Sequence, residues 1–173
     1  MKLIEFDGLE FKVADEAFLI RQIRQLFEAD KSKKKETFWK QMSYLWFMCD
    51  PRSSYMYIVD EKERAKEIMV QEGLGDDWQP SELLTDAMNV YRKHTITTSA
   101  LLLEGMRKGI DKLSTFLGET NISDKTVASM TSALKQIPEL ARALAEAEKS
   151  LAKDFATDEN ARGSASKAVG EDI

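Results

Sequence analysis

The aromatic residues of this chain are concentrated in its first half. Thirteen of the fifteen Phe, Trp and Tyr residues precede residue 94, and only Phe116 and Phe155 follow it. Aromatic side chains bury large areas and dominate the cores of small domains. The sequence therefore predicts a mainly α-helical aromatic-core domain over residues 1–80. The later region is rich in Ala, Leu, Ser and Thr, and it lacks the bulk for a second core of its own.

The densest aromatic stretch is "FWKQMSYLWFMCDPRSSYMY", residues 38–57. A helix predicted over residues 33–49 carries apolar residues on more than one side, which indicates burial on several sides. Pro51 should end it, because proline disfavours helical geometry in the residue before it. The following "SSYMYIV" is predicted to be extended and to fold back on the helix, with Trp39, Trp46, Tyr55 and Tyr57 in one cluster.

This corner has a predicted chemical role for two charged residues. Asp50 should accept N–H groups of its own turn, and Arg52 should bond exposed carbonyls at the helix end. A ligand pocket lined by the aromatic residues is the alternative interpretation. The residues of the predicted structural corner are Trp46, Cys49, Asp50, Pro51, Arg52, Tyr55 and Tyr57.

The N-terminus predicts a β-hairpin packed on the helices. Asp7-Gly8 is a preferred pair for a two-residue turn, which would place Phe6 opposite Leu9 and Ile4 opposite Phe11. Glu5, Glu10 and Lys12 would point away from this apolar face. A hairpin is marginal alone, so its apolar face should cover the core, although its edges could also accept a strand from a neighbour.

Local signals predict where the shorter helices begin and end. Asp15 is expected to cap a helix that runs to about residue 29, with Leu19, Ile23, Leu26 and Phe27 on one face. Asp60 should start a further helix, and Gly73 should stop it. The basic run "KSKKK" at 31–35 is predicted to be a solvated helix start, with contact to an acidic partner as the alternative.

The region 81–155 predicts a long antiparallel helical hairpin, followed by a flexible or partner-ordered polar tail over 156–173. Apolar stripes at steps of three and four run from Leu84 to Phe116 and from Val127 to Phe155. The β-branched "HTITTS" at 94–99 could break the first helix, and Pro138 should kink or divide the second. Gly105 and Gly109 indicate either a kink or a close helix–helix contact.

Composition and motifs exclude several classes of function. A net charge of −5 disfavours a specific nucleic-acid binder, and one cysteine excludes an internal disulfide. The only histidine, His94, has no sequence relation to Cys49 that would make a catalytic pair. The sequence predicts no enzyme, no cofactor, no metal and no membrane span, and a chain made in the cytoplasm.

One segment resembles a known class of proteins. "YLWFMCDPRSSYMYIVDEKERAKEI" is similar to a segment of small helical virion proteins of tailed bacteriophages, in which an aromatic helix ends in Asp-Pro-Arg-Ser before an aromatic and an acidic-basic helix start. The similarity covers about residues 38–72. The matching residues are Trp46, Phe47, Asp50, Pro51, Arg52, Ser53, Tyr55, Asp60, Glu61 and Arg64. The resemblance implies a non-enzymatic virion protein at the head–tail connector or tail.

The functional prediction is therefore a structural subunit of a multi-copy assembly, located in the virion. Its expected partners are other virion or assembly proteins, with copies of itself in a ring or array. The predicted interface comprises Leu101, Leu103, Gly105, Gly109 and Ile110, because Leu101, Leu103 and Ile110 lie off the first helix's stripe. The alternative is a small helical adaptor or regulatory protein that binds its partner through the hairpin.

Overall fold

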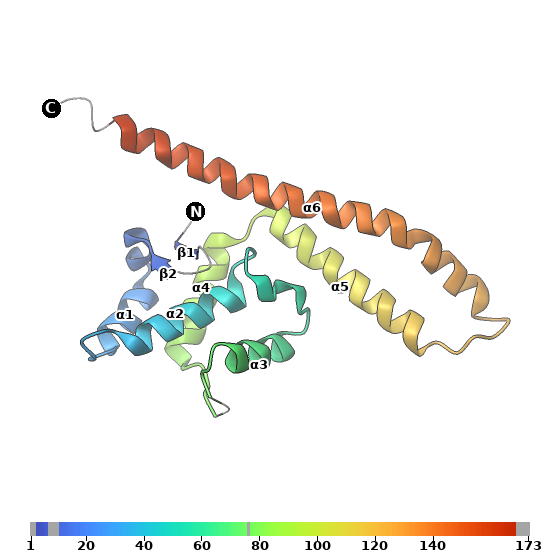
Figure 1. Cartoon of the computed structure of the whole chain (residues 1–173), viewed down its shortest axis with the longest axis horizontal. Helices are drawn as coiled ribbons and strands as arrows, with labels where there is room; N and C mark the ends of the chain where they lie inside the picture. The colour runs from blue at the N-terminus through green and yellow to red at the C-terminus, as the bar shows by residue number, and fades with distance from the viewer. Residues whose placement is uncertain (1–2, 7–10, 76, 169–173) are drawn as a thin grey trace. The chain divides into compact units, whose positions relative to one another are not determined.

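The computed structural model describes residues 3–6, 11–75 and 77–168, and it divides the chain into two compact units (Figure 1). The first unit is Met1–Ile96 and the second is Thr97–Ile173. The described chain is mainly helical, with a short antiparallel two-stranded sheet near the N-terminus. This confirms the predicted fold class.

The strands of the sheet are β1 (Ile4–Phe6) and β2 (Phe11–Val13). Ile4 pairs with Val13 and Phe6 pairs with Phe11, so the predicted register is wrong by two residues. A two-residue shift leaves every side chain on its predicted face, because the side-chain period of a strand is two. Ile4 is accordingly buried, and Glu5 and Lys12 are exposed. The predicted Asp7-Gly8 turn lies outside the described residues.

The predicted first helix begins later than expected. Residues Asp15–Leu19 form a 3-10 helix, and α1 (Arg21–Ala29) starts only after Ile20. Asp15 is therefore not the helix cap. The extended backbone at Ile20 changes the phase, so that Ala17 and Ile20 are buried while Leu19 is 80% exposed.

The lysine run connects α1 to the next helix, and side chains in and beside it cap the end of the one and the start of the other. α2 (Glu36–Cys49) begins after Lys35, whose φ of 53° turns the chain sharply. The Asp30 carboxylate accepts hydrogen bonds from the backbone N–H groups of Ser32 and Phe38, at 2.8 and 2.9 Å. Lys35 Nζ in turn donates to the carbonyls of Phe27 and Asp30, at the end of α1. A lysine at this end complements the helix dipole, which gives part of the basic run an internal role.

The chain turns after α2 as predicted, but it does not become extended. The helix ends at Cys49, and residues Ser54–Tyr57 form a 3-10 helix. The Ser53 hydroxyl accepts from the N–H of Tyr55, which offers the backbone a helical turn in place of a strand.

The next helix has the predicted ends. α3 (Glu61–Gln71) is capped by the Asp60 carboxylate, which accepts from the N–H groups of Lys62 and Glu63. Gly73 follows with φ 63°, and the N–H of Leu74 bonds to the carbonyl of Met69. This is the arrangement in which glycine closes a helix.

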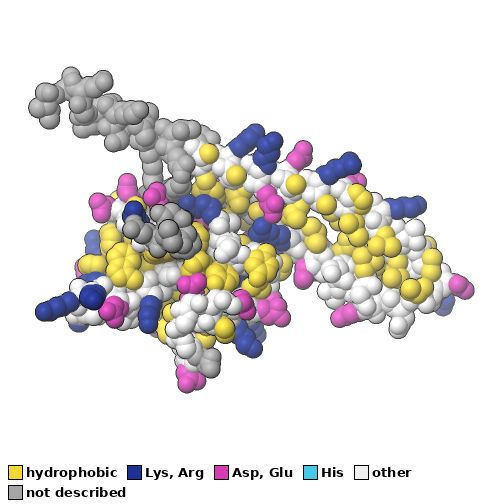
Figure 2. All heavy atoms as spheres, in the orientation of Figure 1, with side chains coloured by type: hydrophobic (Ala, Val, Ile, Leu, Met, Phe, Trp, Pro, Cys, Tyr) yellow, Lys and Arg dark blue, Asp and Glu magenta, His cyan; other side chains and the backbone are white. Residues whose placement is uncertain are grey.

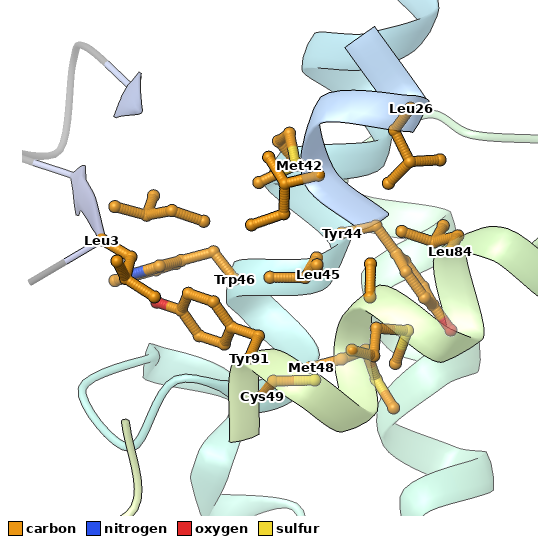
Figure 3. Close-up of a cluster of buried hydrophobic side chains, with 14 of the residues drawn as sticks. Leu3, Leu26, Met42, Tyr44, Leu45, Trp46, Met48, Cys49, Leu84 and Tyr91 are labelled. Carbon is orange, nitrogen blue, oxygen red and sulfur yellow. The ribbon is translucent and has the colours of Figure 1, made fainter. Parts of the chain in front are cut away.

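α4 (Glu82–Thr95) belongs to the first unit, so the structure divides the chain after Ile96 rather than after residue 80. Leu84, Ala87 and Tyr91 of this helix lie in the same core as residues of α1 and α2. Figure 3 shows Tyr44 and Leu45 among Leu84, Tyr91 and other buried side chains of this core. α4 is thus part of the aromatic-core domain and not part of the first helix of the long hairpin.

The second unit is a helical hairpin. α5 (Thr98–Glu119) and α6 (Val127–Ala168) pack side by side, joined by residues 120–126 (Figure 1). Pro138 lies inside α6 and does not divide it. The helix continues to Ala168, beyond the end predicted at residue 155, and residues 169–173 lie outside the described part of the chain.

Candidate functional site

A buried carboxylate organises the corner after α2. The Asp50 side chain is fully buried and accepts a hydrogen bond of 2.6 Å from the hydroxyl of Tyr91 in α4. Arg52 binds the same carboxylate through Nε at 2.8 Å and Nη2 at 2.7 Å, and the backbone N–H of Arg52 adds a bond of 2.9 Å. Burial and the nearby Asp50 charge raise the pKa of Tyr91, so its hydroxyl stays a donor.

Arg52 also links the corner to the sheet, because its Nη2 donates to the carbonyl of Ile4 in β1 at 2.9 Å. Asp50 thus accepts from its own turn as predicted. Two carbonyls near the end of α2 accept hydrogen bonds from other side chains: Ser53 Oγ donates to Phe47 O at 2.8 Å and Arg64 Nη1 to Met48 O at 3.4 Å. The sequence predicted this helix-end role for Arg52 and missed Tyr91, Ser53 and Arg64. The cluster joins the turn after α2 to α4 and to β1, and its carboxylate is fully buried.

The aromatic cluster includes only part of the predicted set. The rings of Trp46 and Phe47 lie 5.1 Å apart, and those of Phe47 and Tyr55 lie 5.0 Å apart, both edge to face. Tyr57 is 68% exposed and Trp39 is 39% exposed, so the prediction that both share this cluster is wrong. The 3-10 turn at Ser54–Tyr57 directs Tyr57 outwards, whereas Trp39 packs against Phe38 at 5.2 Å.

The two residues that a nucleophilic mechanism would need lie in different environments. Cys49 is buried, and burial raises the pKa of its thiol to about 11. A thiol with so high a pKa is a poor nucleophile near neutral pH. His94 is exposed at the end of α4. The described residues contain no group of three or more His, Cys, Asp or Glu side chains placed to hold a metal.

A shallow cavity of about 290 Å³ lies beside the exposed face of Trp39. It is lined by Phe11, Trp39, Lys40, Ser43, Glu72 and Leu74. Of the four aromatic residues that the alternative interpretation placed around a ligand pocket, only Trp39 lines this cavity. Its polar side chains are those of a wet surface, and nothing in their arrangement points to one ligand class.

The seam of the hairpin matches the predicted stripe of α5 only in part: Met106 of that stripe packs against it, but its buried centre lies off the stripe. Ala100 and Leu103 are buried against Ala147, Leu151 and Phe155 of α6. Leu103, expected to need an outside partner, is therefore covered by α6, and Ile110 is half-buried. Arg107 binds Glu148 across the seam at 3.1 Å, and the hydroxyls of Ser99 and Ser150 lie 3.0 Å apart.

The rest of the predicted stripe of α5 lies towards a second, outer face. Leu102 is 57% exposed, Phe116 is 39% exposed, and Gly105 and Gly109 lie between them on the same side of the helix. Leu101, next to this face, is 54% exposed. A Cβ added at either glycine would meet no atom within 4 Å, so these glycines serve no close contact among the described residues. We call Leu101, Leu102, Gly105, Gly109 and Phe116 the outer face of α5.

The first third of α6 is exposed and poor in charge. Leu134 is 54% exposed, Ile137 is 42% exposed and Val127 is 45% exposed. Between Val127 and Ala141, only Lys135 and Glu139 carry charge. Figure 2 shows hydrophobic side chains gathered near the closed end of the hairpin. Depletion of charge on an exposed apolar surface is typical of the centre of a protein–protein interface.

Comparisons with protein-family models, with curated proteins and with solved structures found no match to this chain. Within the described residues, no helix has both the length and the apolar character needed to cross a membrane.

Proposed function

We propose that this chain is a non-enzymatic structural subunit of a multi-copy assembly, and that it binds neighbouring subunits through the α5–α6 hairpin. The observation that carries the proposal is that the hairpin exposes more large apolar side chains than it buries. Seven large ones are at least 39% exposed, namely Leu101, Leu102, Phe116, Ile122, Val127, Leu134 and Ile137. The buried cluster of the described hairpin contains only three large side chains, Leu103, Leu151 and Phe155.

This balance differs between the two units. Among the described residues of the first unit, nineteen buried hydrophobic residues form one core. Two helices alone can bury only their facing stripes, so the remaining apolar surface of the hairpin is available to a partner. We therefore assign folding of the subunit to the first unit and assembly to the second.

The resemblance of residues 38–72 to tailed-phage virion proteins supports the head–tail connector or the tail as the place of this assembly. In that setting the partners are other virion proteins and further copies of this chain. The first test is mass spectrometry of particles purified from the cells in which the chain is made. A fixed ratio to the major shell protein is the expected result, whereas recovery only in a soluble complex would favour the adaptor alternative.

The second test separates assembly from folding. Leu134→Glu together with Ile137→Glu places two charges on the exposed surface of α6, and Ser132→Glu on the same exposed helix is the matched control. The double variant should keep its helical circular dichroism and lose incorporation into the particle or complex. The control should retain both, and normal incorporation of the double variant would refute the assignment of the interface to this surface.

A further inference from the structure

The break between α4 and α5 has an unusual construction. Only Ile96 and Thr97 separate the two helices, and both have extended backbone, with ψ of 126° and 165°. The sequence from Glu82 to Glu104 contains neither glycine nor proline. Helices usually break at such residues or at an insertion into the hydrogen-bond ladder, and here the break depends on a cap instead.

The cap is the side chain of Thr97, whose Oγ1 accepts from the N–H of Ala100 at 3.1 Å. If Ile96 and Thr97 took helical dihedrals, about four backbone hydrogen bonds of the i to i−4 type would replace this single cap. Against this, two β-branched residues have weak helix propensity. The broken and the joined forms thus differ by rotations at two residues and by small opposing free energies.

The apolar pattern keeps its phase across the break. Leu84, Met88, Tyr91 and Thr95 are buried in the first unit, and the steps of four and three continue through Thr98 and Leu102 to Gly109 and Phe116. If the two helices were always separate, the apolar positions of α5 would not need to continue the helical spacing of the apolar positions of α4. The stripe of α5 that contains Thr98, Leu102, Gly109 and Phe116 is therefore in register with the buried face of α4, as in one continuous helix.

We propose that residues 95–98 are a conformational switch, and that Glu82–Glu119 closes into one continuous helix in a second state of the protein. In that state the apolar stripes of α4 and α5 form one stripe along a helix about 57 Å long, at ~1.5 Å per residue over 38 residues. The proposal concerns the chain by itself and holds whether or not the assembly is a virion.

Two opposed variants test it. Thr98→Pro fits the broken form, because proline is favoured at the first helical position and the preceding Thr97 is already extended, with φ −113°. In a continuous helix the same proline would remove a hydrogen bond and clash with the preceding turn. Ile96→Ala with Thr97→Ala removes the cap and raises helix propensity, which should increase the ratio of joined to broken form about tenfold to thirtyfold.

The measurement is the distance distribution between spin labels at Asp86→Cys and Lys112→Cys, two exposed positions, with Cys49→Ala as background. A continuous helix separates these positions by about 39 Å along its axis. The double alanine variant should populate a distance that Thr98→Pro lacks. Amide exchange at Ser99 gives a second readout, since its N–H would bond to Thr95 in the joined form and exchange at least about tenfold more slowly than in Thr98→Pro.

Near-UV circular dichroism of the aromatic core controls for folding of the first unit in both variants. The proposal is overturned if the double alanine variant, with this core intact, matches Thr98→Pro both in its distance distribution and in the exchange rate of Ser99. A new distance shared by the double alanine variant and Thr98→Pro also overturns it, because the proline variant cannot form the continuous helix.

Discussion

Replacing Tyr91 by Phe is the most direct test of the buried corner. The change removes one hydroxyl, whose hydrogen bond to the Asp50 carboxylate is 2.6 Å long and fully buried at both ends. A hydrogen bond to a charged group contributes about 1.5–3 kcal/mol to stability. Asp50 keeps its bonds to Arg52 in the variant, so the carboxylate is not left without a partner. We therefore expect a loss of about 2 kcal/mol.

The matched control is Tyr55→Phe. The hydroxyl of Tyr55 also donates to a carboxylate, that of Glu72, at 3.1 Å. This pair lies at the surface, where water can replace the lost partner, and the expected change is within about 0.5 kcal/mol. Both substitutions delete the same atom, so their difference isolates the effect of burial.

The assay is urea unfolding followed by tryptophan fluorescence. Trp39, Trp46 and Trp78 all lie in the first unit, so the signal reports this unit alone. For a unit of this size, a loss of about 2 kcal/mol should lower the urea midpoint by roughly 1–2 M. Equal midpoints for Tyr91→Phe and Tyr55→Phe would show that the hydroxyl–Asp50 contact does not stabilise the fold, and would refute the reasoning.

Three further outcomes follow from the structure. Cys49 should react with thiol reagents far more slowly than a free thiol at pH 8, because it is buried and its pKa is raised to about 11; a rate like that of an unfolded peptide would contradict its place in the core. The bonds from Phe38 and Ser32 lower the pKa of Asp30 from 3.8 to about 2, so its contribution to stability is complete above about pH 4 and is lost as the pH falls towards 2; Asp30→Asn should flatten this part of the stability–pH profile. Leu103→Glu should unfold the hairpin, with a cost of at least ~3 kcal/mol by far-UV circular dichroism, whereas Leu102→Glu should leave its helicity intact.

Local chemistry made some features predictable from sequence. Proline disfavours helical geometry in the residue before it, so Pro51 marks the end of α2. Gly73 takes a positive φ at little cost, so it marks the end of α3. Neither helix end depends on the rest of the fold. The register of the β-hairpin is different, because pairings two residues apart place the same side chains on the core and the pattern cannot distinguish them. Tyr57 was misplaced for a related reason: a short aromatic run fits a strand and a 3-10 turn equally well.

In the candidate interface, the sequence pattern indicated how much apolar surface α5 carries but not which of its faces is buried. The sequence assigned Leu102 and Phe116 to the interior and Leu103 to an outside partner, and the structure reverses both assignments. The pattern shows that α5 has apolar residues on more than one face, and it does not show which of these faces α6 covers. The inference that a partner is needed rests on a different quantity, the total apolar width of α5. That width exceeds what a single neighbouring helix can cover, so α6 leaves one apolar face of α5 exposed, and this exposed face is the basis of the proposed interface.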